Sequence, residues 1–275
     1  MQHTVYDFFT RDENERDWLI AILSDFQFEG FEETSDSLKA YIYTEKMNQD
    51  MMADILLQND FSHIAFTSSD IQEKNWNEEW EKNFDPVLIV ERVAIRAPFH
   101  APITAEYEIV IEPKMSFGTG HHATTASVVQ LMLNEDFRGH KVLDFGSGTG
   151  VLAILAEQLK AAKIVAIDNE VWAFHNCVEN IERNGCVHIQ TIQGDDSYVF
   201  NEKFDIILAN INRNVILKNI SYWKNLMNPN GLLIVSGILQ NDETDIVLQA
   251  EKNDLVVKDI LRTNGWLAIS FKSKK

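Results

Sequence analysis

The fold is decided by the stretch Val142-Leu143-Asp144-Phe145-Gly146-Ser147-Gly148-Thr149-Gly150, in which an apolar run leads into three closely spaced glycines. Such a run is typical of a strand that is buried on both faces of a parallel sheet. Glycine has no Cβ atom, so a turn rich in glycine lets the backbone approach a ligand closely. The stretch therefore predicts a strand, a ligand-binding turn and a helix in succession.

The spacing of the glycines separates three kinds of nucleotide-binding turn. A dinucleotide fingerprint, G-x-G-x-x-G, requires a different spacing, and position 151 is Val. A phosphate-binding loop requires Gly-Lys-Ser/Thr, which does not follow here. The observed G-x-G-x-G favours S-adenosylmethionine over a nicotinamide cofactor, although a short glycine pattern by itself is equally typical of a plain tight turn.

The next apolar run, Ile164–Asp168, ends in an acidic residue twenty positions after Gly148. An acidic side chain in this place accepts hydrogen bonds from both hydroxyls of a ribose. Because Asn169 and Glu170 open the following helix, an N-cap role for Asp168 is the alternative. The two features together support a bound S-adenosylmethionine.

Further apolar runs alternate with segments whose apolar residues recur at helical spacing. The runs Ile206–Asn210 and Leu232–Ser236 read as buried parallel strands, so we predict a doubly wound α/β domain over residues 86–275. Short β-type runs precede it between Val87 and Ile111. A final pair of runs, Leu255–Arg262 and Trp266–Phe271, predicts a hairpin at the sheet edge.

The first 70 residues follow a different pattern. They read as a strand, a helix, a hairpin, a helix and a strand, which predicts a small ferredoxin-like α+β domain. The expected elements are a strand at Thr4–Thr10, a helix with the stripe Trp18, Leu19, Ile22, Leu23 and Phe26, a hairpin of Phe28–Glu33 and Leu38–Thr44, a helix at Gln49–Leu57 and a strand at Ser62–Thr67.

Residues 71–85 are expected to connect the two domains. Trp76, Trp80 and Phe84 recur at steps of four, which places them on one face of a helix. We interpret this segment as a linker helix. An ordinary amphipathic helix packed on either core fits the spacing equally well.

Charge is concentrated in the N-terminal third. The chain has a net charge of −18, and residues 1–85 contain 20 Asp or Glu against 6 Lys or Arg. Such a surface repels phosphate backbones and attracts basic partners, so we expect a basic protein partner and no direct nucleic-acid binding. The alternative is that the acidity serves only solubility.

Membrane, metal and disulfide chemistry are not expected. No run approaches the ~18 apolar residues of a membrane helix, and the N-terminus lacks a signal-like apolar core, so we expect a cytoplasmic location. We also expect a monomer. Cys177 and Cys186 are too few for a disulfide framework or a zinc site. The adjacent His121 and His122 diverge, and no carboxylate follows at the spacing of a metal ligand.

Two further positions carry polar chemistry. Thr124 and Thr125 follow a second glycine loop, where their hydroxyls either cap a helix or contact the methionine end of the cofactor. Asn210 ends a strand at the carboxyl edge, where ligands of doubly wound sheets bind. Its amide offers an acceptor to a nucleophilic amine, so we predict a catalytic role; a turn-forming Asn is the alternative.

The order F-G-T-G-x-H-x-T-T, D-F-G-x-G-x-G, an acidic strand end and A-N-I resembles the ribosomal protein L-eleven methyltransferase family, and the resemblance extends from Trp76 to about Leu239. It implies a ferredoxin-like substrate-recognition domain and a class I methyltransferase domain. It also implies that Thr125, Gly146, Asp168 and Asn210 contact S-adenosylmethionine, with Gly148 in the same turn. The departures from the family pattern are His121, Ala123, Ser147 and Asn212.

The implied reaction is an in-line displacement, in which a neutral lysine or N-terminal amine of the ribosomal protein attacks the donor methyl group. No His or Glu is spaced as an evident general base. A methyltransferase for another protein or a nucleic-acid amine is the first alternative, although such enzymes often carry N-P-P-Y or D-P-P-Y where this chain has Asn210-Ile211-Asn212-Arg213. A non-catalytic module that binds basic proteins is the second.

Overall fold

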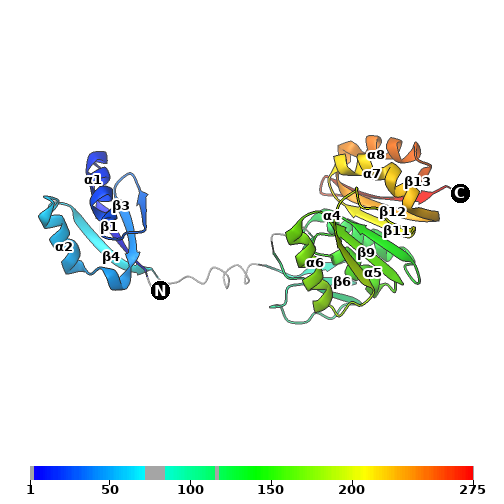
Figure 1. Cartoon of the computed structure of the whole chain (residues 1–275), viewed down its shortest axis with the longest axis horizontal. Helices are drawn as coiled ribbons and strands as arrows, with labels where there is room; N and C mark the ends of the chain where they lie inside the picture. Colours follow the sequence, from blue (N-terminus) through cyan, green and yellow to red (C-terminus); the bar gives the residue numbers. More distant parts are fainter. Residues whose placement is uncertain (1–2, 72–83, 115–117, 275) are drawn as a thin grey trace. The chain divides into compact units, whose positions relative to one another are not determined.

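The computed structural model describes residues 3–71, 84–114 and 118–274. The chain forms two compact units, Met1–Asn83 and Phe84–Lys275, each with its own core (Figure 1). Most of the expected linker helix, including Trp76 and Trp80, lies outside the described residues. Ile71 closes a strand, and Phe84 lies in irregular backbone.

The first unit is an antiparallel sheet with two helices on one face, as Figure 1 shows. Its strand order, β2-β3-β1-β4, is that of a ferredoxin-like fold, which confirms the prediction. The elements are β1 (His3–Phe9), α1 (Glu13–Ser24), β2 (Gly30–Glu33), β3 (Leu38–Tyr43), the short 3-10 helix η1 (Thr44–Lys46), α2 (Gln49–Gln58) and β4 (Ala65–Ile71).

The core of this unit corrects one expectation about α1. Leu19 and Leu23 are buried, whereas Trp18 is 64% exposed and Phe26 is 42% exposed. Each helical residue turns by about 100°, so a helix whose buried face is centred near Leu19 and Leu23 leaves Trp18 on its flank. Phe26 lies beyond the helix, which ends at Ser24.

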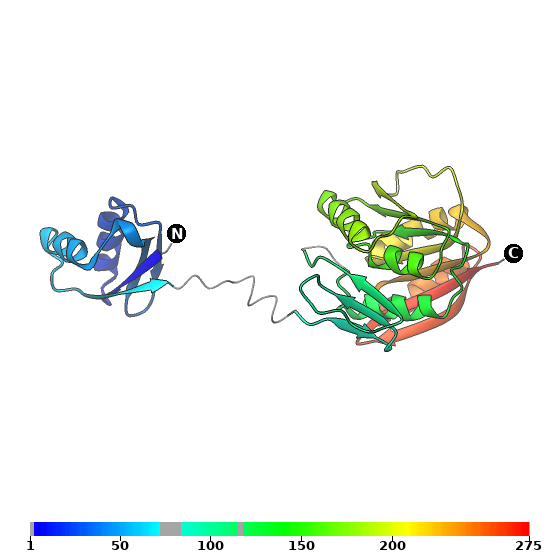
Figure 2. The ribbon, with the colours of Figure 1, turned by 90° about the horizontal axis from the view of Figure 1, so that it is seen from below.

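The second unit is a doubly wound α/β domain, as predicted, and Figure 2 shows green helices in front of its central sheet and yellow and orange ones behind it. Its seven-stranded sheet has the order β10-β9-β8-β11-β12-β14-β13, in which β10 to β12 are parallel and β14 is antiparallel to both neighbours. The elements of this sheet and its helices are α4 (Ala123–Leu133), β8 (Lys141–Phe145), α5 (Val151–Gln158), β9 (Lys163–Asp168), α6 (Val171–Arg183), β10 (Ile189–Gln193), β11 (Phe204–Asn210), α7 (Arg213–Leu226), β12 (Met227–Leu239), η2 (Gln240–Asp242), α8 (Glu243–Glu251), β13 (Leu255–Thr263) and β14 (Trp266–Ser273).

Alternate residues of each parallel strand enter separate cores, which explains the continuous apolar runs. In β8, Val142 packs with side chains of α4, α5 and α6, whereas Leu143 packs with those of α7 and α8. Both faces of the central strands β8, β9 and β11 are therefore covered, so most of their residues have an apolar environment. The edge strand β10 was not predicted, because its sequence Ile-Gln-Thr-Ile-Gln has neither a continuous apolar run nor a regular alternation of apolar and polar side chains.

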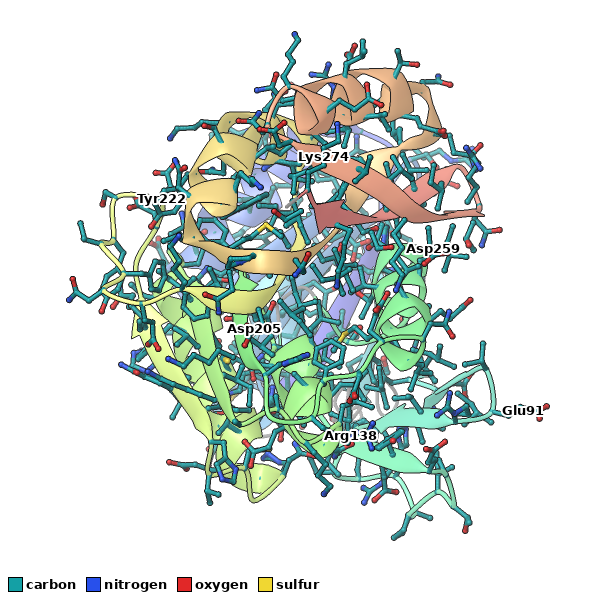
Figure 3. All side chains as sticks on the ribbon, turned by 90° about the vertical axis from the view of Figure 1, so that its right-hand side faces the viewer. Glu91, Arg138, Asp205, Tyr222, Asp259 and Lys274 are labelled. Carbon is teal, nitrogen blue, oxygen red and sulfur yellow. The ribbon has the colours of Figure 1, made fainter. Side chains whose placement is uncertain are left out.

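A small three-stranded sheet completes the second unit. It consists of β5 (Val87–Ile89), β6 (Val93–Arg96) and β7 (Tyr107–Val110), and Figure 3 shows Glu91 at the tip of its projecting hairpin. In the same view Tyr222 of α7 lies beside the loop after β10, where its hydroxyl donates to the Tyr198 carbonyl at 2.7 Å. Among the described helices, none has the length and apolar character needed to cross a lipid bilayer.

Candidate active site

A cleft opens at the carboxyl edge of the large sheet, where β8 lies between β9 and β11. The chain leaves β8 toward β9 and later returns to the other side of β8, so this edge is the topological switch point at which doubly wound sheets bind ligands. Two adjoining cavities, of about 410 and 390 Å³, form the cleft. They share Gly146, Asp168, Asn169, Glu170, Ile211 and Asn212.

The glycine turn after β8 forms one wall of the cleft. Gly146, Gly148 and Gly150 all have positive φ, at 75°, 54° and 81°, a conformation that side chains other than glycine rarely adopt. The Gly146 amide donates to the Ile167 carbonyl at 2.8 Å, which fixes the turn to the neighbouring strand. A Cβ atom on Gly146 would lie 2.3 Å from Cγ2 of Ile211. The turn therefore needs glycine for its backbone conformation, and Gly146 has no space for a side chain.

Asp168 joins the two cavities. Its carboxylate accepts hydrogen bonds from the amides of Gly148 at 2.8 Å and Glu170 at 3.0 Å, and only 8% of the residue is exposed. Each carboxylate oxygen has a further lone pair, so two hydroxyls can still bind. The N-cap residue of α6 is Glu170, yet Asp168 holds its amide, so Asp168 supports the start of the helix while it faces the cleft.

Asp144 lies below the same turn in a different environment. Burial is the main cause that raises the pKa of this carboxyl to about 7, and the charge of Asp168 raises it further. One oxygen accepts from the Ala153 amide at 3.1 Å, and the other has no hydrogen-bond partner among the described residues. A protonated Asp144 avoids a second negative charge close to Asp168.

Asn210 and Thr125 meet at the other end of the first cavity, although they are far apart in sequence. The Asn210 amide nitrogen donates to the hydroxyl of Thr125 at 3.2 Å, and Thr125 is fully buried on α4. The amide oxygen Oδ1 of Asn210 is buried, and within the described part of the chain it has no hydrogen-bond partner. Asn210 therefore lines the cavity with its amide held in orientation by Thr125.

All five residues predicted to bind the cofactor line the first cavity: Thr125, Gly146, Gly148, Asp168 and Asn210. The paired histidines have separate roles. His122 lines the cavity and caps α4, accepting from the Thr124 amide at 3.3 Å, whereas His121 bonds to the Asp85 carbonyl at 2.8 Å. No group of three potential metal ligands is found among the residues that the structure describes.

The sequence patterns did not identify several other residues of the cleft. Trp266 lines the first cavity, with its ring centre 4.7 Å from that of His122. The pairing of β14 with β12 brings it there, and no local pattern signals this. Gly194, Asp195 and Asp196 line the second cavity after β10. If the sequence had predicted the strand β10, Asp195 and Asp196 would have been recognised as acidic residues at its carboxyl end.

These features fit S-adenosylmethionine. A glycine cradle, a carboxylate with free lone pairs and a buried unused acceptor occupy a single cleft of suitable size for a small molecule. The fold and the site together define a class I S-adenosylmethionine-dependent methyltransferase.

Sequence comparison then gives the family. The profile described as "Ribosomal protein L11 methyltransferase (PrmA)" matches residues 10–274. The ribosomal protein L11 methyltransferase of Bacteroides fragilis is 38% identical over 264 residues, which cover 94% of each chain. The chain therefore belongs to the ribosomal protein L11 methyltransferase family.

Solved structures agree with this assignment. The ribosomal protein L11 methylase of Lactobacillus delbrueckii subsp. bulgaricus has a TM-score of 0.65 and 25% identity, over 70% of this chain and 100% of that one. The Thermus thermophilus 16S rRNA methyltransferase, solved with AdoMet and guanosine, has a TM-score of 0.50 and 16% identity, over 58% of this chain and 45% of that one. The second likeness shows the shared fold alone.

Proposed function

We propose that the chain transfers methyl groups from S-adenosylmethionine to amines of ribosomal protein L11, at lysine side chains, the N-terminus or both. The observation that carries this proposal is that Asn210 lines the cleft and that its amide oxygen Oδ1 accepts no hydrogen bond from a described residue. An amine has N–H groups to donate to such an acceptor. The substrate named for the relatives, ribosomal protein L11, offers amines of this kind.

In this proposal Gly146, Gly148 and Asp168 hold the donor. The glycine backbone makes room for it, and the Asp168 carboxylate accepts its ribose hydroxyls. Thr125 and Asn210 lie at the opposite end of the same cavity. When bound, S-adenosylmethionine supplies an electrophilic methyl group on a positively charged sulfur.

Asn210 positions the attacking amine. Its Oδ1 accepts an N–H hydrogen bond, and because Thr125 holds the other end of the amide, the amine lone pair has a fixed direction. Losing the lysine proton at pH 7 costs about 4.6 kcal/mol for an unperturbed lysine. The aromatic rings of His122 and Trp266 line the same cavity, and apolar surface beside an amine disfavours its charged form, which favours the neutral amine. We assign no general base.

The other parts of the proposal concern partners and location. We propose that the first unit recognises the basic ribosomal protein, since residues 1–85 carry 20 acidic against 6 basic side chains. We further propose that the enzyme acts as a monomer in the cytoplasm and does not bind nucleic acid directly.

A direct assay tests the proposal. The purified chain is incubated with tritiated S-adenosylmethionine and ribosomal protein L11 from cells that cannot methylate it, and mass spectrometry counts the added methyl groups. We expect label on L11 and none on an acidic control protein of equal size. Donor binding without label on any ribosomal protein would contradict the proposed function.

A further inference from the structure

Three asparagines lie on one face of α6. Asn176, Asn180 and Asn184 recur every four residues along the helix and its C-cap, which places them one above the other. Asn176 and Asn180 are fully buried. A buried carboxamide is costly unless its donors and its acceptor are all paired, so the partners of these side chains show what the asparagines hold in place.

Asn180 joins two segments that are far apart in the chain. Its Oδ1 accepts from the Glu112 amide at 2.8 Å. Its Nδ2 donates to the Thr149 carbonyl at 3.0 Å and to Oδ1 of Asn176 at 3.2 Å. Both N–H groups and the oxygen are therefore paired, and one side chain ties the backbone that follows β7 to the glycine turn that follows β8.

Thr149 makes a second connection from the same glycine turn. Its hydroxyl donates to the Gly118 carbonyl at 2.8 Å, and the residue is fully buried. Gly118 has a φ of 106°, and a Cβ atom there would lie 2.7 Å from Oγ1 of Thr149, so the loop and the turn meet without room for a side chain. Gly118 lines the first cavity, whereas Thr149 and Asn180 lie outside its lining.

We propose that Thr149 and Asn180 are positioning residues for the methyl donor, and we call the pair the loop clamp. Asn180 fixes the chain at Glu112, before the loop, and Thr149 fixes it at Gly118, where the loop enters the wall of the cavity. Without the clamp the donor must restore this part of the wall when it binds, and that ordering cost lowers its affinity. The inference rests on the proposed placement of the donor in this cleft.

The alternative is that these hydrogen bonds only stabilise the fold, and Asn184 provides a matched control for that role. Its Oδ1 accepts from the Val110 amide at 2.9 Å, and its Nδ2 donates to the Val110 carbonyl at 2.8 Å. Asn184 thus holds the same stretch of chain one helical turn away, at a residue that does not line the donor cavity. Asn184→Ala should therefore lower stability without changing donor affinity.

Two substitutions at Thr149 separate its hydrogen bond from its packing. Thr149→Val keeps the branched shape and loses the hydroxyl, whereas Thr149→Ser keeps the hydroxyl and loses the methyl group. These variants, Asn180→Ala and Asn184→Ala are made in the full chain. Calorimetry with S-adenosylmethionine measures donor affinity, and thermal melting measures stability. If Asn180→Ala does not fold, the two Thr149 variants decide the question by themselves.

We expect Thr149→Val and Asn180→Ala to raise the donor dissociation constant about tenfold, while Thr149→Ser and Asn184→Ala stay within about threefold of wild type. Hydrogen exchange without donor gives a second readout, because the amides of residues 118–122 should exchange faster in Thr149→Val and not in Asn184→Ala.

A loss of affinity in Thr149→Ser but not in Thr149→Val would show that only packing matters and would overturn the clamp. Affinity losses that follow the melting temperature through all the variants, Asn184→Ala included, would overturn it too. Unchanged affinity in Thr149→Val beside a loss in Asp168→Ala would reject the clamp and leave the proposed donor site intact. The expected pattern of donor affinities, without methylation of L11 by the wild type, would support the clamp and reject the proposed reaction.

Discussion

Asp168 and Asn210 end two strands on either side of β8, yet their side-chain oxygens differ in the hydrogen bonds that they accept. Both carboxylate oxygens of Asp168 already accept backbone amides at 2.8 and 3.0 Å. Asn210 uses only its nitrogen, and its buried oxygen has no partner in the described structure. Both side-chain oxygens at the first strand end already accept a hydrogen bond, whereas the oxygen at the second accepts none from a described residue.

This difference separates two tasks within one cleft. Asp168 is held rigidly because the donor end must keep its shape, and its remaining lone pairs add binding energy. A buried acceptor without a partner costs free energy in the unbound protein, and a ligand that supplies an N–H removes that cost. We therefore expect changes at Asp168 to act on donor affinity and changes at Asn210 to act on rate.

The largest expected effect is on the rate of Asn210→Ala. Without the acceptor the amine loses its fixed direction, so the single-turnover methylation rate should fall roughly a hundredfold while donor affinity changes little. Asn212→Ala is the control, because Asn212 lines the same cleft but its side chain caps α7 through the Val215 amide at 3.1 Å. A rate within threefold of wild type for Asn210→Ala would contradict the proposal that Asn210 acts on the methylation rate.

Asp168→Ala should weaken donor binding next most strongly. Hydrogen bonds to a charged group contribute about 1.5–3 kcal/mol, which corresponds to a tenfold to hundredfold increase in the donor dissociation constant. Calorimetry with S-adenosylmethionine measures this change. Asp168→Asn keeps one acceptor oxygen, so its donor affinity should lie between those of the wild type and Asp168→Ala. Unchanged affinity would place Asp168 outside the donor site.

The pH dependence of stability tests the carboxyl beneath the donor turn. Because burial raises the pKa of Asp144 to about 7, the folded state holds its proton more tightly than the unfolded state does. This contribution is fully present below about pH 4 and is lost as the pH rises through 7. Urea unfolding should show Asp144→Asn gaining about 2 kcal/mol relative to wild type between pH 5.5 and 8. A constant difference across this range would mean that Asp144 is ionised throughout.

The smallest expected effect concerns Gly146. Gly146→Ala places a Cβ atom 2.3 Å from Ile211 at a φ of 75°, whereas Gly185→Ala creates a similar φ strain at 64° with no atom within 4 Å. The first variant should therefore lose about 1 kcal/mol more stability than the second. Adding Ile211→Ala should recover this excess. Equal losses would mean that backbone conformation alone requires the glycine.

The glycine turn, Asp168 and Asn210 could be predicted from the sequence because each lies at the end of an apolar run, and parallel strands bring their carboxyl ends to one edge. The ferredoxin-like and doubly wound folds followed from the same patterns. Trp18 was misjudged, since an apolar stripe does not reveal which part of it meets the sheet. The strand β10 was missed because an edge strand need not be apolar on both faces.

Local periodicity and spacing determined the elements, their order and the polar residues at the strand ends, because these depend on neighbours in the chain. Only the tertiary structure decided which of those residues share a hydrogen bond. Thr125 and Asn210 are 85 residues apart, and Trp266 reaches the cleft from the last hairpin through β-sheet pairing. The packing of α4 against the sheet brings Thr125 to one end of the Asn210 amide, whereas no described residue donates a hydrogen bond to the buried oxygen at the other end.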